Sequence, residues 1–206
     1  MLDVGCNLNI KFSMNSKFLF SIFFLVTLSF FAQAQNNSPT VPIDSATNKI
    51  TYSKVVWVDS SLLKLELFSR AREWFAKAFK SSNNVIQMED KENGKIVGKG
   101  LTQVYCKSLG GDRKSGFINF TLSIYIKDGR YKYEITDFYH SGQPELNIPD
   151  YGSCEDWIND KRKHPMMSQK ATQKISNYFL EQLDFNTKKM IEDLAKAMKR
   201  QTKENW

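Results

Sequence analysis

Two predicted strands joined by a tight turn constrain the fold of this chain more than any other feature. Residues 116–127 and 130–140 alternate apolar and polar side chains, and Asp128-Gly129 stands between them. Asp-Gly accepts the positive φ values of a tight hairpin turn, so Lys127 is expected to pair with Arg130. Because side chains alternate between the faces of a sheet, this register assigns every residue of the hairpin to one face.

One face of the predicted hairpin is apolar and the other is mixed. We expect burial beneath helices for Ile118, Phe120, Leu122, Ile124, Ile126, Tyr131, Tyr133, Ile135 and Tyr139. We expect greater exposure for Phe117, Asn119, Thr121, Ser123, Tyr125, Lys132, Glu134, Thr136, Phe138 and His140. The register pairs Ile118 with Tyr139 and Phe120 with Asp137, the one charged residue on the apolar face. One packed and one solvated face is typical of an antiparallel sheet covered on one side.

Three more strands and two helices complete the prediction of an α+β fold. Residues 50–58 are rich in branched and aromatic side chains, which favours a strand. Residues 85–90 and 95–105 flank Asn93-Gly94 and predict a second hairpin. A helix is expected from Asp59 or Ser60, as its N-cap, to about residue 80.

The second helix is expected to run from about residue 168 into the C-terminal segment, residues 168–206, and to pack on the sheet. Residues 184–187, Asp-Phe-Asn-Thr, are a weak spot where this helix is expected to kink or break. The segment 141–167 between sheet and helix is a long, Pro- and Gly-punctuated loop, and loops of this length are often functional. Its apolar residues Tyr151 and Trp157 indicate that it is partly pinned down.

The N-terminal residues predict export. Lys17 precedes an apolar run over residues 18–31 that is too short to span a bilayer, and Ala32-Gln33-Ala34 matches a signal-peptidase site. We therefore expect a signal peptide over residues 1–34, read from Met14 as the natural start, and a flexible leader over 35–49. The alternative is an uncut membrane anchor. The predicted location is the periplasm, the cell surface or the medium.

The net charge limits the possible partners, and the cysteine content limits the possible disulfides. The chain carries a formal net charge of +7, which is compatible with nucleic acid, anionic lipid or an acidic polymer as partner. Acidic residues are interleaved with the basic ones, so we favour a solvated helix face, and export argues against nucleic acid. Cys106 and Cys154 remain after the signal peptide, and export permits a disulfide between them; two thiols are the alternative.

Five segments carry a resemblance to a known family: Lys54–Asp59, Arg72–Phe75, Asn83–Asp90, Gly94–Gly100 and Asp128–Phe138. On these segments the region of about 50–140 resembles secreted bacterial proteins known as a domain of unknown function with a TBP-like fold. The resemblance implies a curved antiparallel sheet with helices on one face, in the order strand, helix, four strands, helix. It implies no activity, because fold does not transfer function.

Asp137 and the histidines are the candidates for catalysis. A buried Asp137 with a raised pKa is a possible general acid or base. We favour a structural carboxylate that accepts from a Lys or Tyr, caps a helix or lies at the sheet rim. His140 with Glu134 or Asp137 would suit an envelope hydrolase, which is the alternative to a binding protein. His164 is the other histidine.

No cofactor or metal is expected from the sequence. The histidines and cysteines lack the spacing of a metal site. Gly94, Gly98 and Gly100 lie within a predicted strand rather than between a strand and a helix, so they do not form a phosphate loop. Gly98 and Gly100 instead indicate a bulge or a close backbone approach.

We therefore expect an exported binding module rather than an enzyme. The predicted site is the exposed sheet face with the loop 141–167 at its rim, and its residues are Tyr125, Lys132, Glu134, Phe138 and His140. Candidate ligands are an envelope protein, a glycan or a small apolar molecule held between sheet and helix. A third possibility is an interaction protein that acts through its basic C-terminal helix.

Overall fold

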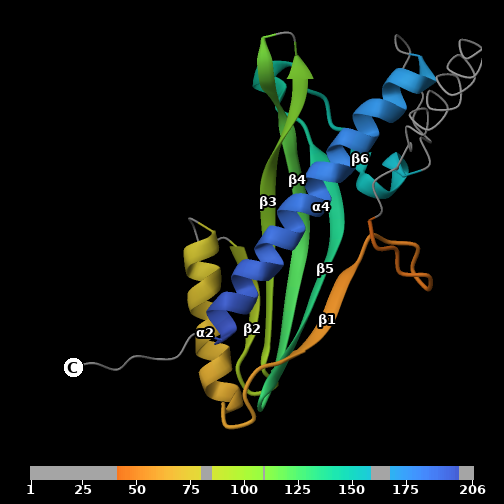
Figure 1. Ribbon diagram of the computed structural model, residues 1–206. Helices are drawn as coiled ribbons and strands as arrows, with labels where there is room; N and C mark the ends of the chain where they lie inside the picture. Colours follow the sequence, from red (N-terminus) through yellow and green to blue (C-terminus); the bar gives the residue numbers. More distant parts are fainter. Residues whose placement is uncertain (1–40, 80–84, 109, 159–167, 200–206) are drawn as a thin grey trace, which may run out of the picture. The chain divides into compact units, whose positions relative to one another are not determined.

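The computed structural model describes residues 41–79, 85–108, 110–158 and 168–199. The predicted signal peptide, most of the second half of the long loop and His164 lie outside the described residues. The elements follow the order β1, α2, β2, β3, β4, β5, η1, β6, η2 and α4 (Figure 1).

A single antiparallel sheet carries two helices on one of its faces, which confirms the predicted α+β fold (Figure 1). The strand order is β1-β5-β4-β3-β2, and the short β6 pairs with β5. The strands are β1 Tyr52–Trp57, β2 Ile86–Asp90, β3 Lys95–Ser108, β4 Gly111–Lys127, β5 Arg130–Ser141 and β6 Gly152–Ser153. The helices are α2 Lys64–Ala78, α4 Gln169–Lys199 and the 3-10 turns η1 Pro144–Leu146 and η2 Cys154–Trp157.

The predicted register of the β4–β5 hairpin is confirmed over its first half. Lys127 pairs with Arg130, and the pairing continues to Leu122 with Ile135. The residues expected beneath the helices are buried: Ile118, Phe120, Leu122, Ile124 and Ile126. Those expected on the other face are only partly buried: Thr121, Ser123, Lys132, Glu134 and Thr136. The alternation of side chains therefore sets the two faces of the sheet as predicted.

A β-bulge changes the register in the second half of the hairpin. Thr121 pairs with Thr136 but Asn119 pairs with Tyr139, so two residues of β5 lie opposite Phe120. Asp137 has φ +58°, the left-handed conformation that an inserted bulge residue can adopt. The pairs predicted for Ile118 and Phe120 are therefore wrong.

The bulge exchanges the faces of the residues that follow it. Phe138 and His140 are buried beneath the helices, whereas Tyr139 is 46% exposed. Asp137 is exposed and its carboxylate lies 2.7 Å from the Lys49 ammonium. The hydrogen bond from Lys49 lowers the pKa of Asp137, the opposite of the raised pKa that a general acid needs. Asp137 is thus a structural carboxylate at the sheet rim.

Gly98 and Gly100 allow aromatic rings to lie directly on β3, as the predicted close approach requires. A Cβ built on Gly100 would lie 2.4 Å from Cζ of Phe120 and 2.7 Å from Cε1 of Phe79. A Cβ on Gly98 would lie 2.6 Å from Cε1 of Phe75. Any side chain at these positions would displace the rings that fill the space between α2 and the sheet.

The tip of the β4–β5 hairpin caps α2. The Lys64 backbone N–H donates to Oδ1 of Asp128 at 2.6 Å, and the Gly129 N–H donates to the Leu62 carbonyl at 2.9 Å. A carboxylate at a helix N-terminus satisfies a free N–H and complements the helix dipole. The predicted cap residue, Asp59, instead accepts from the N–H and hydroxyl of Ser61, so the helix begins later than expected.

Helix α4 runs without a break over the expected weak spot at residues 184–187. Asp184 is held on both sides, because Tyr52 donates to it at 2.9 Å and Lys188 forms an ion pair with it at 2.6 Å. Gln182 reaches the edge of β3. Its side-chain amide accepts from the Tyr105 N–H at 2.9 Å and donates to the Tyr105 carbonyl at 2.8 Å.

The described part of the predicted flexible leader forms a turn at the sheet. Residues 43 and 50 are bridged, and Asp44 accepts from the Ala46 N–H at 2.9 Å. Val41 and Ile50 are buried, and the Ile50 N–H donates to Glu155 of η2 at 2.9 Å. The folded domain thus begins earlier than residue 50.

The bulge yields a stability prediction. Asp137→Val should lower the free energy of unfolding by about 1–2 kcal/mol, because a β-branched residue is strained at positive φ. Asp137→Gly should lower it by about 1 kcal/mol or less, because Gly adopts this conformation freely and an exposed ion pair contributes little. Chemical denaturation measures both values, and Ser123→Val on the same face is the matched control. Equal losses for the Val and Gly variants would contradict the bulge as the reason for the Asp137 conformation.

Candidate functional site

The sheet face turned away from α2 and α4 is the candidate site, and we call it the open face. The register aligns Lys95, Tyr125, Lys132 and Val55 in one row across β3, β4, β5 and β1. A neighbouring row at the hairpin tip contains Lys127, Arg130 and Trp57. Both described α-helices pack on the opposite face, so these side chains meet solvent in the described part of the chain (Figure 1).

Cations flank the aromatic rings of the open face. The Nζ atoms of Lys95 and Lys132 lie 5.3 and 5.6 Å from the centre of the Tyr125 ring. The Arg130 guanidinium lies 4.6 Å from the centre of the Trp57 ring, which is 67% exposed. These distances are those of cation–π contacts, which hold the rings and the charges in fixed relative positions.

The charge of the open face is positive. Its acids are engaged: Glu134 pairs with Lys132 at 2.8 Å, Asp137 pairs with Lys49, and Asp90, opposite Lys95, accepts from the backbone N–H and the side-chain amide of Asn93. The hydrogen bond that Lys132 donates to Glu134 raises the pKa of Lys132, so this ammonium stays charged. Among the described residues, the cations that have no ion pair on this face are Lys95, Lys99, Lys127 and Arg130.

The structure brings together three of the predicted site residues. Tyr125, Lys132 and Glu134 are neighbours on the open face. Phe138 and His140 lie on the opposite face, because the bulge at Asp137 shifts them, so their assignment to the site is wrong. Trp57 and Arg130 also belong to the open face, and no local sequence pattern indicates their contact, because it depends on the pairing of β1 with β5.

His140 is a core residue. It is fully buried, and its ring lies 4.8 Å from that of Tyr151 and 5.6 Å from that of Phe179, measured between ring centres. Its Nε2 donates to the Ser115 carbonyl at 2.6 Å, and its Nδ1 accepts from the Tyr151 N–H at 3.3 Å. Both ring nitrogens are thus occupied within the protein.

The proposed catalytic pairs of His140 do not form. Glu134 and Asp137 lie on the open face, on the other side of the sheet from the imidazole. A general base must lie within hydrogen-bond reach of the proton that it takes. The arrangement therefore does not support the hydrolase alternative.

The predicted disulfide between Cys106 and Cys154 is not formed. Sγ of Cys106 lies 3.1 Å from Oγ of Ser115, and Cys154 is buried at the start of η2. Among the described residues no three His, Cys, Asp or Glu side chains are grouped to hold a metal ion. No helix in the described ranges has the length and hydropathy of a membrane span.

The described part of the long loop, residues 141–158, packs against the rest of the protein, as Tyr151 and Trp157 predict. Strand β6 pairs with the end of β5, and Trp157 is buried with its ring centre 5.3 Å from that of Phe179. Residues 159–167 lie outside the described residues. Residues 141–158 therefore form part of the core around His140.

Replacing His140 should destabilise the protein rather than remove an activity. His140→Ala would open a cavity beside Tyr151 and Phe179 and leave the Ser115 carbonyl without its donor. We expect a loss of about 2–4 kcal/mol in the free energy of unfolding. Tyr139→Ala, which changes the preceding residue on the exposed side of the sheet, should lower the free energy of unfolding by about 1 kcal/mol or less. Thermal or urea unfolding of both variants measures the difference, and an unchanged stability of His140→Ala would show that the ring is not part of the core.

Comparison with known proteins agrees with this architecture. A family model described as "Domain of unknown function (DUF4468) with TBP-like fold" matches residues 52–141. No match is found among curated proteins. A DUF4468 family protein from Bacteroides ovatus has a similar structure, with TM-score 0.56 and 19% identity over 80% of this chain and 94% of that chain.

A second solved structure shows the same fold. A TBP-like protein from Parabacteroides distasonis matches with TM-score 0.53 and 18% identity, covering 75% of this chain and 97% of that one. At these identities the two structures support the fold alone. With the observed strand order, the family model and the two structures show that this chain has a TBP-like fold and that its residues 52–141 are similar to the DUF4468 family of domains of unknown function.

Proposed function

We propose that this chain is an exported, non-catalytic binding module whose open face captures an acidic, partly apolar segment of another envelope protein. The observation that carries the proposal is the set of cations, without an ion pair among the described residues, beside Trp57 and Tyr125 on a sheet face that no described helix covers. Interfaces use aromatic and Arg side chains as anchors, and complementary charge guides the partner to them.

The chemistry of the open face fits carboxylates. Arg130 is held against Trp57, and a guanidinium presents a planar set of donors that matches a carboxylate in a bidentate contact. Lys95 and Lys99 add two ammonium groups on outward positions of β3, one on each side of Val97. An acidic partner would neutralise these charges without displacing an internal ion pair.

The apolar residues of the open face favour a polypeptide over an anionic glycan. Val55 is 48% exposed and Trp57 is 67% exposed, both on outward positions of β1. A peptide offers apolar side chains together with carboxylates, whereas a glycan has no aliphatic side chains to cover these residues. Burial of apolar area adds to affinity in proportion to the area removed from water.

The N-terminal residues support the export part of the proposal. Lys17, the apolar run 18–31 and Ala32-Gln33-Ala34 have the order of a cleavable signal peptide. A location in the envelope would make other envelope proteins the partners within reach.

Binding of an acidic peptide tests the open face. The probe is a synthetic peptide that alternates Glu and Leu, titrated into the purified mature chain by calorimetry, with a Lys-Leu peptide as the charge control. Lys95→Glu/Lys99→Glu and Trp57→Ala/Tyr125→Ala should each weaken binding of the Glu-Leu peptide at least tenfold. Lys170→Glu/Lys174→Glu makes the same charge change on exposed positions of α4 and should leave it within about twofold.

Two outcomes would overturn this assignment. If the Lys-Leu peptide binds as well as the Glu-Leu peptide, charge does not select the partner. If the α4 variant weakens binding as much as the open-face variants, the site lies on the basic C-terminal helix. Circular dichroism of each variant shows that the fold is retained.

Export is tested by the mass of the secreted protein. We expect a mature species that begins at Gln35 and lacks residues 1–34. Ala32→Arg/Ala34→Arg should prevent cleavage, because the peptidase requires small residues at these positions. A mature protein that still carries residues 18–31 would show that the segment remains as an anchor.

A further inference from the structure

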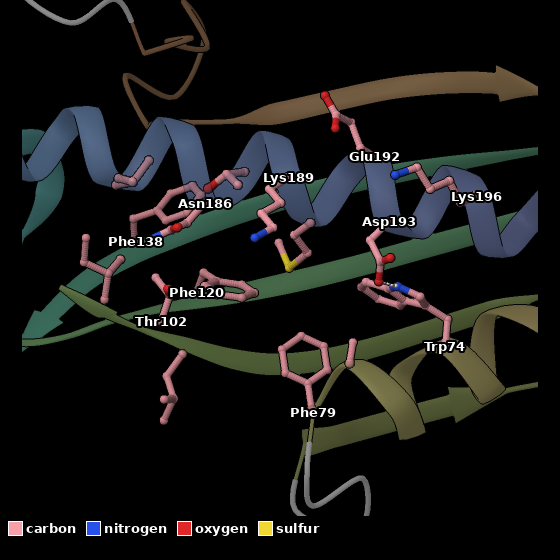
Figure 2. A pocket seen from close by; sticks show the side chains of 16 residues that line it. Trp74, Phe79, Thr102, Phe120, Phe138, Asn186, Lys189, Glu192, Asp193 and Lys196 are labelled. Atoms are coloured by element: carbon pink, nitrogen blue, oxygen red, sulfur yellow. Dashed lines mark hydrogen bonds between the residues drawn. The ribbon is translucent and has the colours of Figure 1, made fainter.

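A pocket of about 420 Å³ lies between the two helices and the sheet, on the side opposite the open face (Figure 2). Small-molecule sites in proteins are clefts of this order, about 300–1,000 Å³, with apolar walls and a few polar groups. Its walls come from the end of α2, the second half of α4 and the strands β3, β4 and β5.

The floor of the pocket is a chain of aromatic rings. The ring centres of Trp74 and Phe79 are 5.8 Å apart, those of Phe79 and Phe120 are 6.3 Å apart, and those of Phe120 and Phe138 are 6.1 Å apart. Gly100 beneath Phe79 and Phe120 lets these rings lie on the backbone of β3. The floor is therefore apolar and rigid.

Helix α2 contacts the C-terminal part of α4, and the pocket is open beyond the point where α2 ends. The Trp74 Nε1–H donates to Oδ2 of Asp193 at 3.0 Å, and Arg70 donates to the Met198 carbonyl at 2.8 Å. Helix α2 then ends at Ala78, while α4 continues above the sheet for several turns. The stretch of floor around Phe138 is thus covered by α4 alone among the described helices.

The polar groups at the mouth select the charge of a ligand. Two carboxylates and two ammonium groups line the mouth. Asp193 accepts from Trp74, and the Glu192 carboxylate is directed away from the floor (Figure 2), whereas Lys189 and Lys196 have no ion pair among the described residues. The Lys189 ammonium is directed over the floor, toward Phe120 (Figure 2). An ammonium above an apolar surface favours a ligand with one anionic group and an apolar body.

We propose that this pocket binds an amphipathic monocarboxylate, with its aliphatic chain on Phe120 and Phe138 and its carboxylate on the Lys189 ammonium. The hydrophobic chain would cover the rings that α2 leaves uncovered. The carboxylate would pair with a charge that the described part of the protein leaves unpaired. This site is separate from the open face and does not rest on the function proposed for it.

A chain-length series tests the apolar part of the site. Octanoate, nonanoate and decanoate are titrated into the purified mature chain by calorimetry, below their micelle concentrations. Each added methylene should tighten binding about fourfold until the pocket is full, because burial of one methylene contributes about 0.8 kcal/mol. Ala78→Phe fills the mouth from an exposed helix position and should abolish saturable binding without changing Tm.

The charge is tested with decanoate against decan-1-ol. Lys189→Met should weaken the binding of decanoate at least tenfold and change the affinity for decan-1-ol by no more than about twofold. Lys174→Met, the same change at an exposed position of α4 outside the pocket, should affect neither ligand. The proposal is overturned if wild-type protein shows no saturable binding of decanoate, if Ala78→Phe binds it normally, or if Lys189→Met weakens acid and alcohol alike.

Discussion

The bulge at Asp137 is the feature on which both faces of the sheet depend. By placing two residues of β5 opposite Phe120, it turns Phe138 and His140 toward the helices and Tyr139 toward solvent. With a regular register, a carboxylate would lie among the aromatic rings beneath α4, where desolvation makes a charge costly. The bulge instead places the Asp137 carboxylate beside Lys49, and the side chains of Phe138 and His140 are buried in the core.

Local sequence patterns predicted the sheet wherever neighbouring residues decide the structure. The Asp-Gly turn and the alternation of side chains were enough to register β4 against β5 as far as Ile135. They do not reveal the bulge, because the alternation of side chains before it is regular and the ion-pair partner of Asp137, Lys49, is distant in the sequence. The start of α2 was placed too early for the same reason, since its capping carboxylate comes from Asp128.

The candidate site was predictable only in part. Tyr125, Lys132 and Glu134 follow from the hairpin alone, because cross-strand neighbours on one face are fixed by its register. Trp57 and Arg130 meet through the β1–β5 pairing, which no local signal specifies. The aromatic pocket needs three strands and two helices to be placed together, so its members appear in the sequence only as ordinary core residues.

The amide of Gln182 has a consequence for self-association. Within the described residues β2 pairs with β3 only as far as Gly98, so the edge of β3 beyond that point has backbone groups that another strand could join. At Tyr105 the Gln182 side chain occupies both the N–H and the carbonyl, as a neighbouring strand would. A helix thus closes the exposed edge at this position and keeps it from serving as a template for aggregation between copies of the protein.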